Sequence, residues 1–134
     1  MHGCYCLSSL PSLRTLIPEF DQLILIFSGL CHDVSHTAHN NAFEMNSFSK
    51  LCIRYNDKSD LENHHLTTTF KILQLPQCNI FEKMDRFDFL YLRKGMINNI
   101  LSTDMKEHFT ILHNFEVKLK ETNFQSEKMS ILSF

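Results

Sequence analysis

Apolar residues recur along this chain at the three- and four-residue spacings of an amphipathic helix. The one short alternation, at 90–92, lies inside a stretch whose wider period favours a helix. The most apolar run, 23–31, is nine residues long and is bounded by Asp21 and His32. A membrane-spanning helix needs about 20 apolar residues. We therefore expect a buried helix at this run and no membrane segment in this chain.

Start and stop signals divide the pattern into segments. Ser59 is followed three residues later by Glu62, a capping box that predicts the start of a helix, and Pro76 predicts its end. Residues 1–18 contain two prolines, and we assign them no single element. The expected helices cover about residues 19–34, 42–54, 60–75, 85–101 and 104–121. Together they predict an all-α, multihelical bundle.

Composition agrees with this prediction and narrows the class of protein. A length of 134 residues fits one ordinary domain, in which 1–18 and 122–134 are the uncertain parts. Only three glycines and three prolines are present, which favours long helices. The net charge of −2 argues against binding nucleic acid through its backbone. Five cysteines without a CxxC pair indicate reduced thiols and a cytoplasmic location.

The candidate chemistry begins where the apolar run ends. His32 and His36 are four residues apart, so they share a face if the helix continues that far. Asp33 places a carboxylate beside the first imidazole, and a carboxylate can bridge two divalent cations. Taken alone, a histidine and an aspartate at a helix end are more typical of a solvated cap than of a metal site.

Two further polar clusters allow the same pair of interpretations. In LENHH at 61–65, Glu62 and His65 are three residues apart, but a capping glutamate followed by surface histidines would look the same. In STDMKEH at 102–108, Thr103 and Asp104 resemble first of all a helix N-cap. Neither cluster by itself indicates a metal site.

Considered together, the three stretches carry a specific resemblance. HDVSHTAHNNAF at 32–43 fits the signature His-Asp-hydrophobic-x-His-x-small-x-x-Asn-x-hydrophobic. YNDKSDLENHH at 55–65 and ILSTDMKEH at 100–108 follow at matching spacing. From about Leu10 to Glu121 the chain resembles the middle of the catalytic domain of the class I 3′,5′-cyclic-nucleotide phosphodiesterases.

The resemblance implies an all-helical, metal-dependent enzyme of cyclic-nucleotide signalling. Such an enzyme hydrolyses cAMP or cGMP to the 5′-monophosphate and uses two divalent metals. The tighter site usually holds zinc, and the looser one holds magnesium or manganese. The cyclic nucleotide is then the expected substrate, and Met105 corresponds to a residue that lines its pocket.

The resemblance also assigns roles to matched positions. His32 corresponds to a ligand of the tighter metal, and Asp33 to a ligand that bridges both metals. His36, Glu62 and Thr103 match residues that hold the water shell of the looser metal. This division is chemically reasonable, because magnesium keeps most of its waters and needs groups that orient them.

The chain also departs from the family pattern. The family usually has aspartate at position 35 and Pro-Gly at 37–38, where this chain has Ser35, Thr37 and Ala38. The HNxxH motif, with a metal-binding histidine and the proton donor, is expected before Met1. The ADxxNP motif, with the last metal-binding aspartate, is expected after Phe134. We therefore expect a middle fragment that is inactive when isolated. The preference between cAMP and cGMP stays open, because the purine-clamping glutamine is expected further downstream.

Two other classes of function stay open. The chain could be a truncated, catalytically inactive remnant that serves as an interaction module, and the flanking reading frame would distinguish this from an enzyme fragment. It could also belong to a different His-Asp metal phosphohydrolase, which the LENHH and STDMKEH segments disfavour. A full-length form could be a homodimer or be attached to a membrane through other segments.

Overall fold

The computed structural model describes the backbone of residues 1–131 and the side chains of residues 1–121. The described part contains helices and connections but no strand, so the all-α prediction is confirmed. The chain divides into two compact units, Met1–Thr103 and Asp104–Phe134, and each is described by itself.

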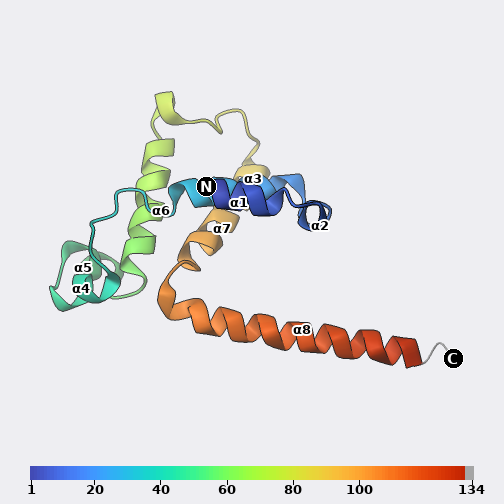
Figure 1. Ribbon diagram of the computed structural model, residues 1–134. Helices are drawn as coiled ribbons and strands as arrows, with labels where there is room; N and C mark the ends of the chain where they lie inside the picture. The colour runs from blue at the N-terminus through green and yellow to red at the C-terminus, as the bar shows by residue number, and fades with distance from the viewer. Residues whose placement is uncertain (132–134) are drawn as a thin grey trace. The chain divides into compact units, whose positions relative to one another are not determined.

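The helices of the first unit follow one another through short connections (Figure 1). They are α1 (His2–Ser8), α2 (Pro11–Arg14), α3 (Glu19–Cys31), α4 (Asn41–Asn46), α5 (Lys50–Tyr55), α6 (Asp60–Leu73), the 3₁₀ helix η1 (Pro76–Cys78) and α7 (Arg86–Leu101). The second unit contains the 3₁₀ helix η2 (Met105–Glu107) and α8 (His108–Ile131).

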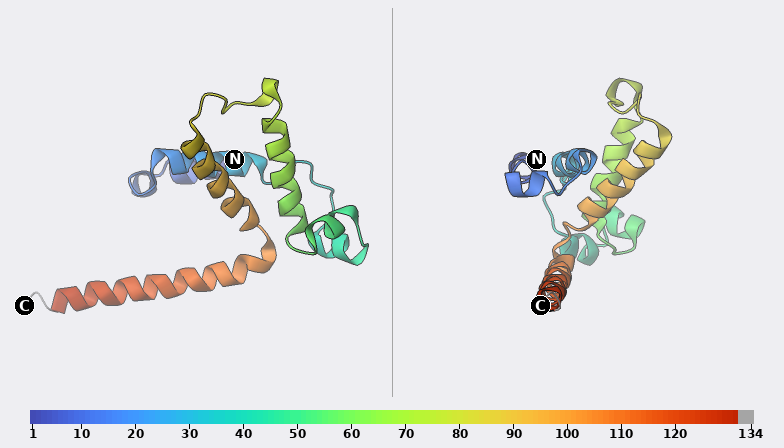
Figure 2. Two further views of the ribbon diagram at one scale, coloured as in Figure 1. Left: turned by 180° about the vertical axis from the view of Figure 1, so that it is seen from behind. Right: turned by 90° about the vertical axis from the view of Figure 1, so that its right-hand side faces the viewer.

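The core of the first unit lies between α3, α6 and α7. Leu92, Met96 and Ile100 of α7 are completely buried against apolar side chains of the other two helices. At Gly95 the backbone of α7 packs so closely on the Ile24 side chain that a Cβ atom would lie 2.7 Å from the Cγ2 atom of Ile24. Glycine is therefore required where α7 crosses α3. Figure 2 shows α1 beside α3, to which the Met1 amino group donates a 3.0 Å hydrogen bond at the Gly29 carbonyl.

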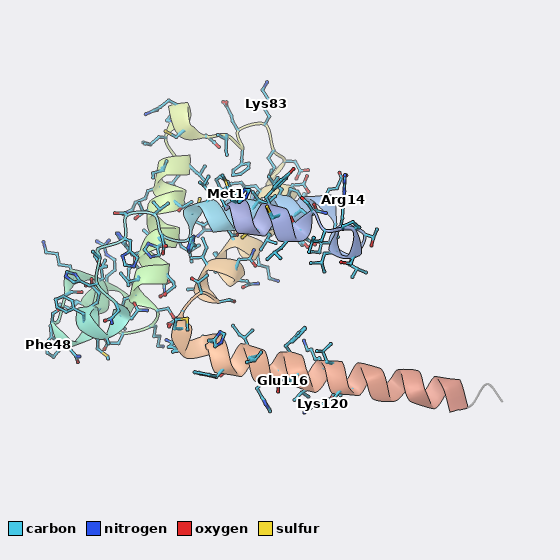
Figure 3. The ribbon with its side chains drawn as sticks, viewed as in Figure 1. Met1, Arg14, Phe48, Lys83, Glu116 and Lys120 are labelled. Carbon is cyan, nitrogen blue, oxygen red and sulfur yellow. The ribbon has the colours of Figure 1, made fainter. Side chains whose placement is uncertain are left out.

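Two predicted helices differ from those observed. The helix expected over 19–34 ends at Cys31, because the next residues turn toward α6 instead. The single helix expected over 42–54 is wrong, since α4 and α5 are separated at Phe48, whose φ is 49°. The Ser49 hydroxyl accepts hydrogen bonds from the first amides of α5, so a serine inside an apolar-periodic run starts a new helix. Phe48 lies exposed at this break (Figure 3).

The two longer helices of the first unit start at the predicted places. Ser59 occupies the N-cap position of α6, but the capping-box interpretation is wrong, because its side chain makes no capping hydrogen bond. The Oδ1 atom of Asn41 accepts from the Leu61 amide instead, at 2.9 Å. Asp85 caps α7 with its own carboxylate, and α7 ends at Leu101 as predicted.

In the second unit, Asp104 is an N-cap, as its place in the sequence predicted. Its Oδ1 atom accepts from the Lys106 amide at 3.0 Å. The first turn is 3₁₀ rather than α-helical, and α8 then continues to Ile131, beyond the expected end at residue 121. Glu116 and Lys120 lie exposed on α8 (Figure 3). Among the described residues, no helix has the length and apolar character that crossing a membrane demands.

Ala38 provides a test of backbone strain in the connection between α3 and α4. Its φ is 65°, in the left-handed region that costs a residue with a Cβ about 1–2 kcal/mol. We expect Ala38→Gly to raise the free energy of unfolding by roughly 0.5–1 kcal/mol, after allowing for the greater freedom of glycine in the unfolded chain. Chemical denaturation measures this change.

Ala42→Gly is the matched control, because Ala42 is exposed inside α4. There the same replacement should lower the free energy of unfolding by about 1 kcal/mol. Opposite signs at the two positions support the left-handed conformation of Ala38, and equal losses contradict it.

Glu44 provides a test of pH dependence. Its carboxylate is buried, and hydrogen bonds from Ser49 and from the Thr37 hydroxyl, the latter 2.7 Å long, lower its pKa below the ordinary 4.5. A lowered pKa in the folded state stabilises the fold above the unfolded-state value. This stabilisation is lost as pH falls from about 4.5 through the folded-state pKa.

We expect the free energy of unfolding to decrease over that acidic range, and we expect Glu44→Gln to make the decrease smaller. Denaturation series at several pH values measure both slopes. Identical slopes in the two proteins would show that Glu44 does not carry the effect.

Candidate metal centre

The connection between α3 and α4, residues 32–40, runs beside the N-terminal half of α6 (Figure 1). Two successive histidines of α6 bind successive carbonyls of this connection. The Nδ1 atom of His65 lies 2.8 Å from the Val34 oxygen, and the Nε2 atom of His64 lies 3.1 Å from the Ser35 oxygen. A carbonyl only accepts, so both nitrogens donate. These bonds hold the connection against α6.

His32 and Asp33 form a pair at the end of α3. The Nδ1 atom of His32 lies 3.1 Å from the Gly29 carbonyl, which fixes the proton on that nitrogen. In the neutral ring the lone pair is then on Nε2, which lies 3.1 Å from Oδ2 of Asp33. A nitrogen lone pair facing a carboxylate oxygen at this distance requires a proton or a metal cation between them. Metal-binding histidines commonly have their second nitrogen fixed by a carbonyl in this way.

Asp33 also belongs to a cluster with His36 and His65. One potential ligand atom from each of the three lies within 4.8 Å of the others. The Nε2 atom of His65 lies 3.9 Å from Oδ1 of Asp33, too far for a hydrogen bond. Two ligands of one cation lie roughly 3–3.5 Å apart. The carboxylate and the imidazole nitrogen are therefore close to the spacing that a shared divalent cation would need.

The two imidazoles of this cluster present different groups. Their rings stack with centroids 5.5 Å apart. The Nδ1 atom of His36 accepts the Ala38 amide proton at 3.0 Å, so a neutral His36 carries its own proton on Nε2. His65 donates from Nδ1 and has its lone pair on Nε2. His36 is thus suited to donate to a water molecule, whereas His65 is suited to bind a cation or to accept a proton.

Burial keeps His65 in the neutral form. The residue is 2% exposed, and desolvation lowers its pKa below the ordinary 6.5. The hydrogen bond to Val34 and the charge of Asp33 act in the opposite direction but are smaller effects. At neutral pH the ring therefore has a free lone pair, which is the state that coordinates metals.

Glu62 lies one turn before His65 on α6 and is 9% exposed. Its Oε2 atom accepts a 2.9 Å hydrogen bond from Nδ2 of Asn41. The same asparagine caps α6 through Oδ1, as described above. Glu62 is therefore bonded to the start of α4, directly after the connection that carries Asp33, although it lies outside the three-residue cluster.

Thr103 and Met105 are placed differently. The Thr103 hydroxyl donates to the Ile100 carbonyl at 2.7 Å. Thr103 and His32 line the same cavity of about 240 Å³, which also borders on α1. Met105 belongs to the second unit, where its side chain is exposed.

Two residues of this region belong to the sequence motifs but were assigned no role at the site. The Nε2 atom of His65 lies 3.9 Å from Asp33, and Asn41 joins the start of α4 to the start of α6. The three-residue spacing of Glu62 and His65 pointed to His65, but a surface position explained it equally well. The signature has its asparagine at Asn41 and not at the neighbouring Asn40, which caps α4, but it gives no structural role for that asparagine.

Comparisons of this chain with known families and known proteins all lead to one family. The sequence model of one protein family, described as 3′5′-cyclic nucleotide phosphodiesterase, matches residues 1–133 of this chain. The human high affinity cGMP-specific 3′,5′-cyclic phosphodiesterase 9A is 38% identical over 132 residues, which cover 93% of this chain. A dual 3′,5′-cyclic-AMP and -GMP phosphodiesterase beta of Plasmodium falciparum is 47% identical over 109 residues, which cover 81% of this chain.

A solved structure agrees with the sequence matches. The phosphodiesterase domain of the RhoPDE fusion protein from the choanoflagellate Salpingoeca rosetta superimposes with a TM-score of 0.72 at 44% identity over 75% of this chain. The matched part is 32% of that solved chain, 22% of the human relative and 10% of the Plasmodium relative. The chain thus spans about a third or less of the length of these three proteins.

The geometry predicts metal binding by the 134-residue chain. We expect Zn²⁺ to raise its melting temperature, by an amount equivalent to about 2.7 kcal/mol at a metal concentration 100-fold above the dissociation constant. Asp33→Asn should remove most of this rise, because Asp33 contacts both His32 and His65. Differential scanning calorimetry with and without the metal measures the effect.

His39→Ala is the control, since His39 is half exposed and stacks on Phe43 instead of joining the cluster. This variant should keep the full rise in melting temperature. Equal losses in the two variants would contradict the assignment of Asp33.

Proposed function

This chain belongs to the 3′5′-cyclic nucleotide phosphodiesterase family, and on that basis we propose that it forms the middle part of a catalytic domain that hydrolyses 3′,5′-cyclic nucleotides to 5′-monophosphates. The observation that supports this most directly is the cluster of Asp33 with His36 and His65. It is formed by two of the segments that carry the resemblance. The exposed Asp33 carboxylate is within reach of three imidazoles.

The donor set fits divalent cations. In the proposal, His32 and Asp33 would hold a tighter zinc ion, and Asp33 would also help to hold a looser magnesium or manganese ion. When bound, the two cations would supply an activated water and offset the charge that develops on the phosphate. His65, which has a lone pair facing Asp33, completes the polar wall of this site.

The other matched residues would orient water. His36 carries a proton on Nε2 when neutral, because its Nδ1 accepts from Ala38, so it can donate to a water oxygen. Glu62 is buried and anchored by Asn41 through Oε2, which leaves its other oxygen available as an acceptor. Thr103 lies on the cavity wall beside His32. We propose that these three residues hold the water shell of the looser cation.

The substrate is proposed at the level of a class. The human relative is named as cGMP-specific, and the Plasmodium relative as acting on both cAMP and cGMP. The shared chemistry is a cyclic phosphodiester on a purine nucleoside, with Met105 as part of the nucleotide pocket. Five free cysteines support the proposal of a reducing, cytoplasmic environment.

We propose that the isolated chain does not turn over substrate, because the matched portion is only about a third of a solved phosphodiesterase domain. A hybrid domain tests its catalytic role. In this hybrid, the chain replaces the matching segment of the Salpingoeca rosetta domain, which supplies the remaining segments. The proposal requires metal-dependent hydrolysis of cAMP or cGMP by the hybrid. A folded hybrid without activity would favour the alternative that the chain is an interaction module.

Within the hybrid, Asp33→Asn should lower kcat/KM by several orders of magnitude, because it weakens the binding of both cations. Hydrolysis assays at saturating Zn²⁺ and Mg²⁺ measure the loss. His39→Ala should stay close to the unmodified hybrid. If the two variants lost activity equally, the assignment of the site residues would be wrong.

A further inference from the structure

We infer that Asn41 is a positioning residue that fixes the Glu62 carboxylate relative to the segment carrying Asp33, an inference that rests on the function proposed above. Asn41 uses both ends of its amide. Its Nδ2 atom donates to Oε2 of Glu62 at 2.9 Å, and its Oδ1 atom accepts from the Leu61 amide at 2.9 Å. The two bonds reach consecutive residues of α6.

The geometry restricts Glu62 more than an ordinary helix cap would. Leu61 is 5% exposed and Glu62 is 9% exposed, so both groups are largely shielded from competing water. Hydrogen bonds to a carboxylate in such surroundings are stronger than bonds between neutral groups. Because Oδ1 is held by the Leu61 amide, the Asn41 amide has a fixed orientation and directs its N–H at one oxygen of Glu62.

The neighbouring asparagine shows that this contact is distinct from helix capping. Asn40 accepts from the Phe43 amide at 2.8 Å and so caps α4, its own helix. Asn41 is the first residue of α4 but bonds to α6, 20 and 21 residues further along. It therefore joins the two helix starts at the side of α6 that carries Glu62 and His65.

Two replacements separate capping from positioning. Asn41→Asp keeps an oxygen that can accept from Leu61, but it replaces the N–H donor with an oxygen that repels Glu62. Asn41→Ala removes both bonds. Asn40→Ala is the matched control, because it removes a helix cap of similar strength without touching Glu62.

The first measurement uses the 134-residue chain with ¹³C-labelled glutamate. We expect the carboxyl carbon signal of Glu62 to shift in both Asn41 variants and to stay in place in Asn40→Ala. Hydrogen exchange of the Leu61 amide should accelerate in Asn41→Ala but not in Asn41→Asp. An unchanged Glu62 signal in Asn41→Asp overturns the inference.

The second measurement uses the hybrid domain. Asn41→Asp should lower kcat roughly 10- to 100-fold, as expected when an orienting partner is lost, with little change in KM. An equal loss in Asn40→Ala would show general loosening and overturn the inference. If the unmodified hybrid has no activity, the proposed function fails, whereas the Glu62 signal still decides the role of Asn41.

A double variant keeps the inference testable if Asn41→Asp alone does not fold. In Asn41→Asp combined with Glu62→Gln, the amide at position 62 can donate to the carboxylate at position 41, which restores the bond with donor and acceptor exchanged. The side-chain amide protons at position 62 should exchange more slowly than in Glu62→Gln alone. Equal exchange rates in the two proteins overturn the inference.

Discussion

The hydrogen bonds between residues 34–41 and the first two turns of α6 determine the geometry of the candidate site. They join Val34 to His65, Ser35 to His64, and Asn41 to Leu61 and Glu62. The short connection after α3 contains two left-handed residues, Ser35 and Ala38, whose conformation costs free energy. With these bonds, the exposed Asp33 carboxylate is held near the buried His65 of α6. The backbone strain is thus offset by bonds made at the same place.

These bonds also decide the chemistry of each imidazole. His32 and His65 each donate from Nδ1 to a main-chain carbonyl, so in the neutral rings the lone pairs are on the Nε2 atoms, which lie nearest to Asp33. His36 accepts a main-chain N–H at Nδ1 and therefore presents a proton instead. The backbone in this way distinguishes two potential ligands from one donor, although the three side chains are chemically identical.

The packing of the helices places the residues of the candidate site. The close approach at Gly95 allows α7 to lie directly on Ile24 of α3. As a result, the end of α3, with His32, and the end of α7, with Thr103, border one cavity. The buried Glu44 of α4 accepts hydrogen bonds from Thr37, which precedes this helix, and from Ser49, which follows it. These bonds hold the segments before and after α4 in place. The site is therefore formed at the ends of elements whose middles make up the core.

The sequence by itself determined the helical fold, the start of α7 at Asp85, the start of α6 near Ser59 and the family motif around His32 and Asp33. These features depend on residues within about one helical turn of each other, and such spacings can be read from the chain directly. The roles of Glu62, Thr103 and Met105 were taken from the family resemblance, because no local spacing in the chain points to them.

Only the tertiary structure decided that Asn41, rather than Ser59, caps α6, and that His65 faces Asp33. It also decided that the apolar period over 42–54 breaks at Phe48. The physical reason is the same in the first two cases. The partners are 20 and 32 residues apart along the chain, and a polar side chain carries no local signal of which distant group will satisfy its hydrogen bonds. In the third case, a local cap at Ser49 competed with a periodic pattern, and the contacts of α4 and α5 with α6 favoured the break.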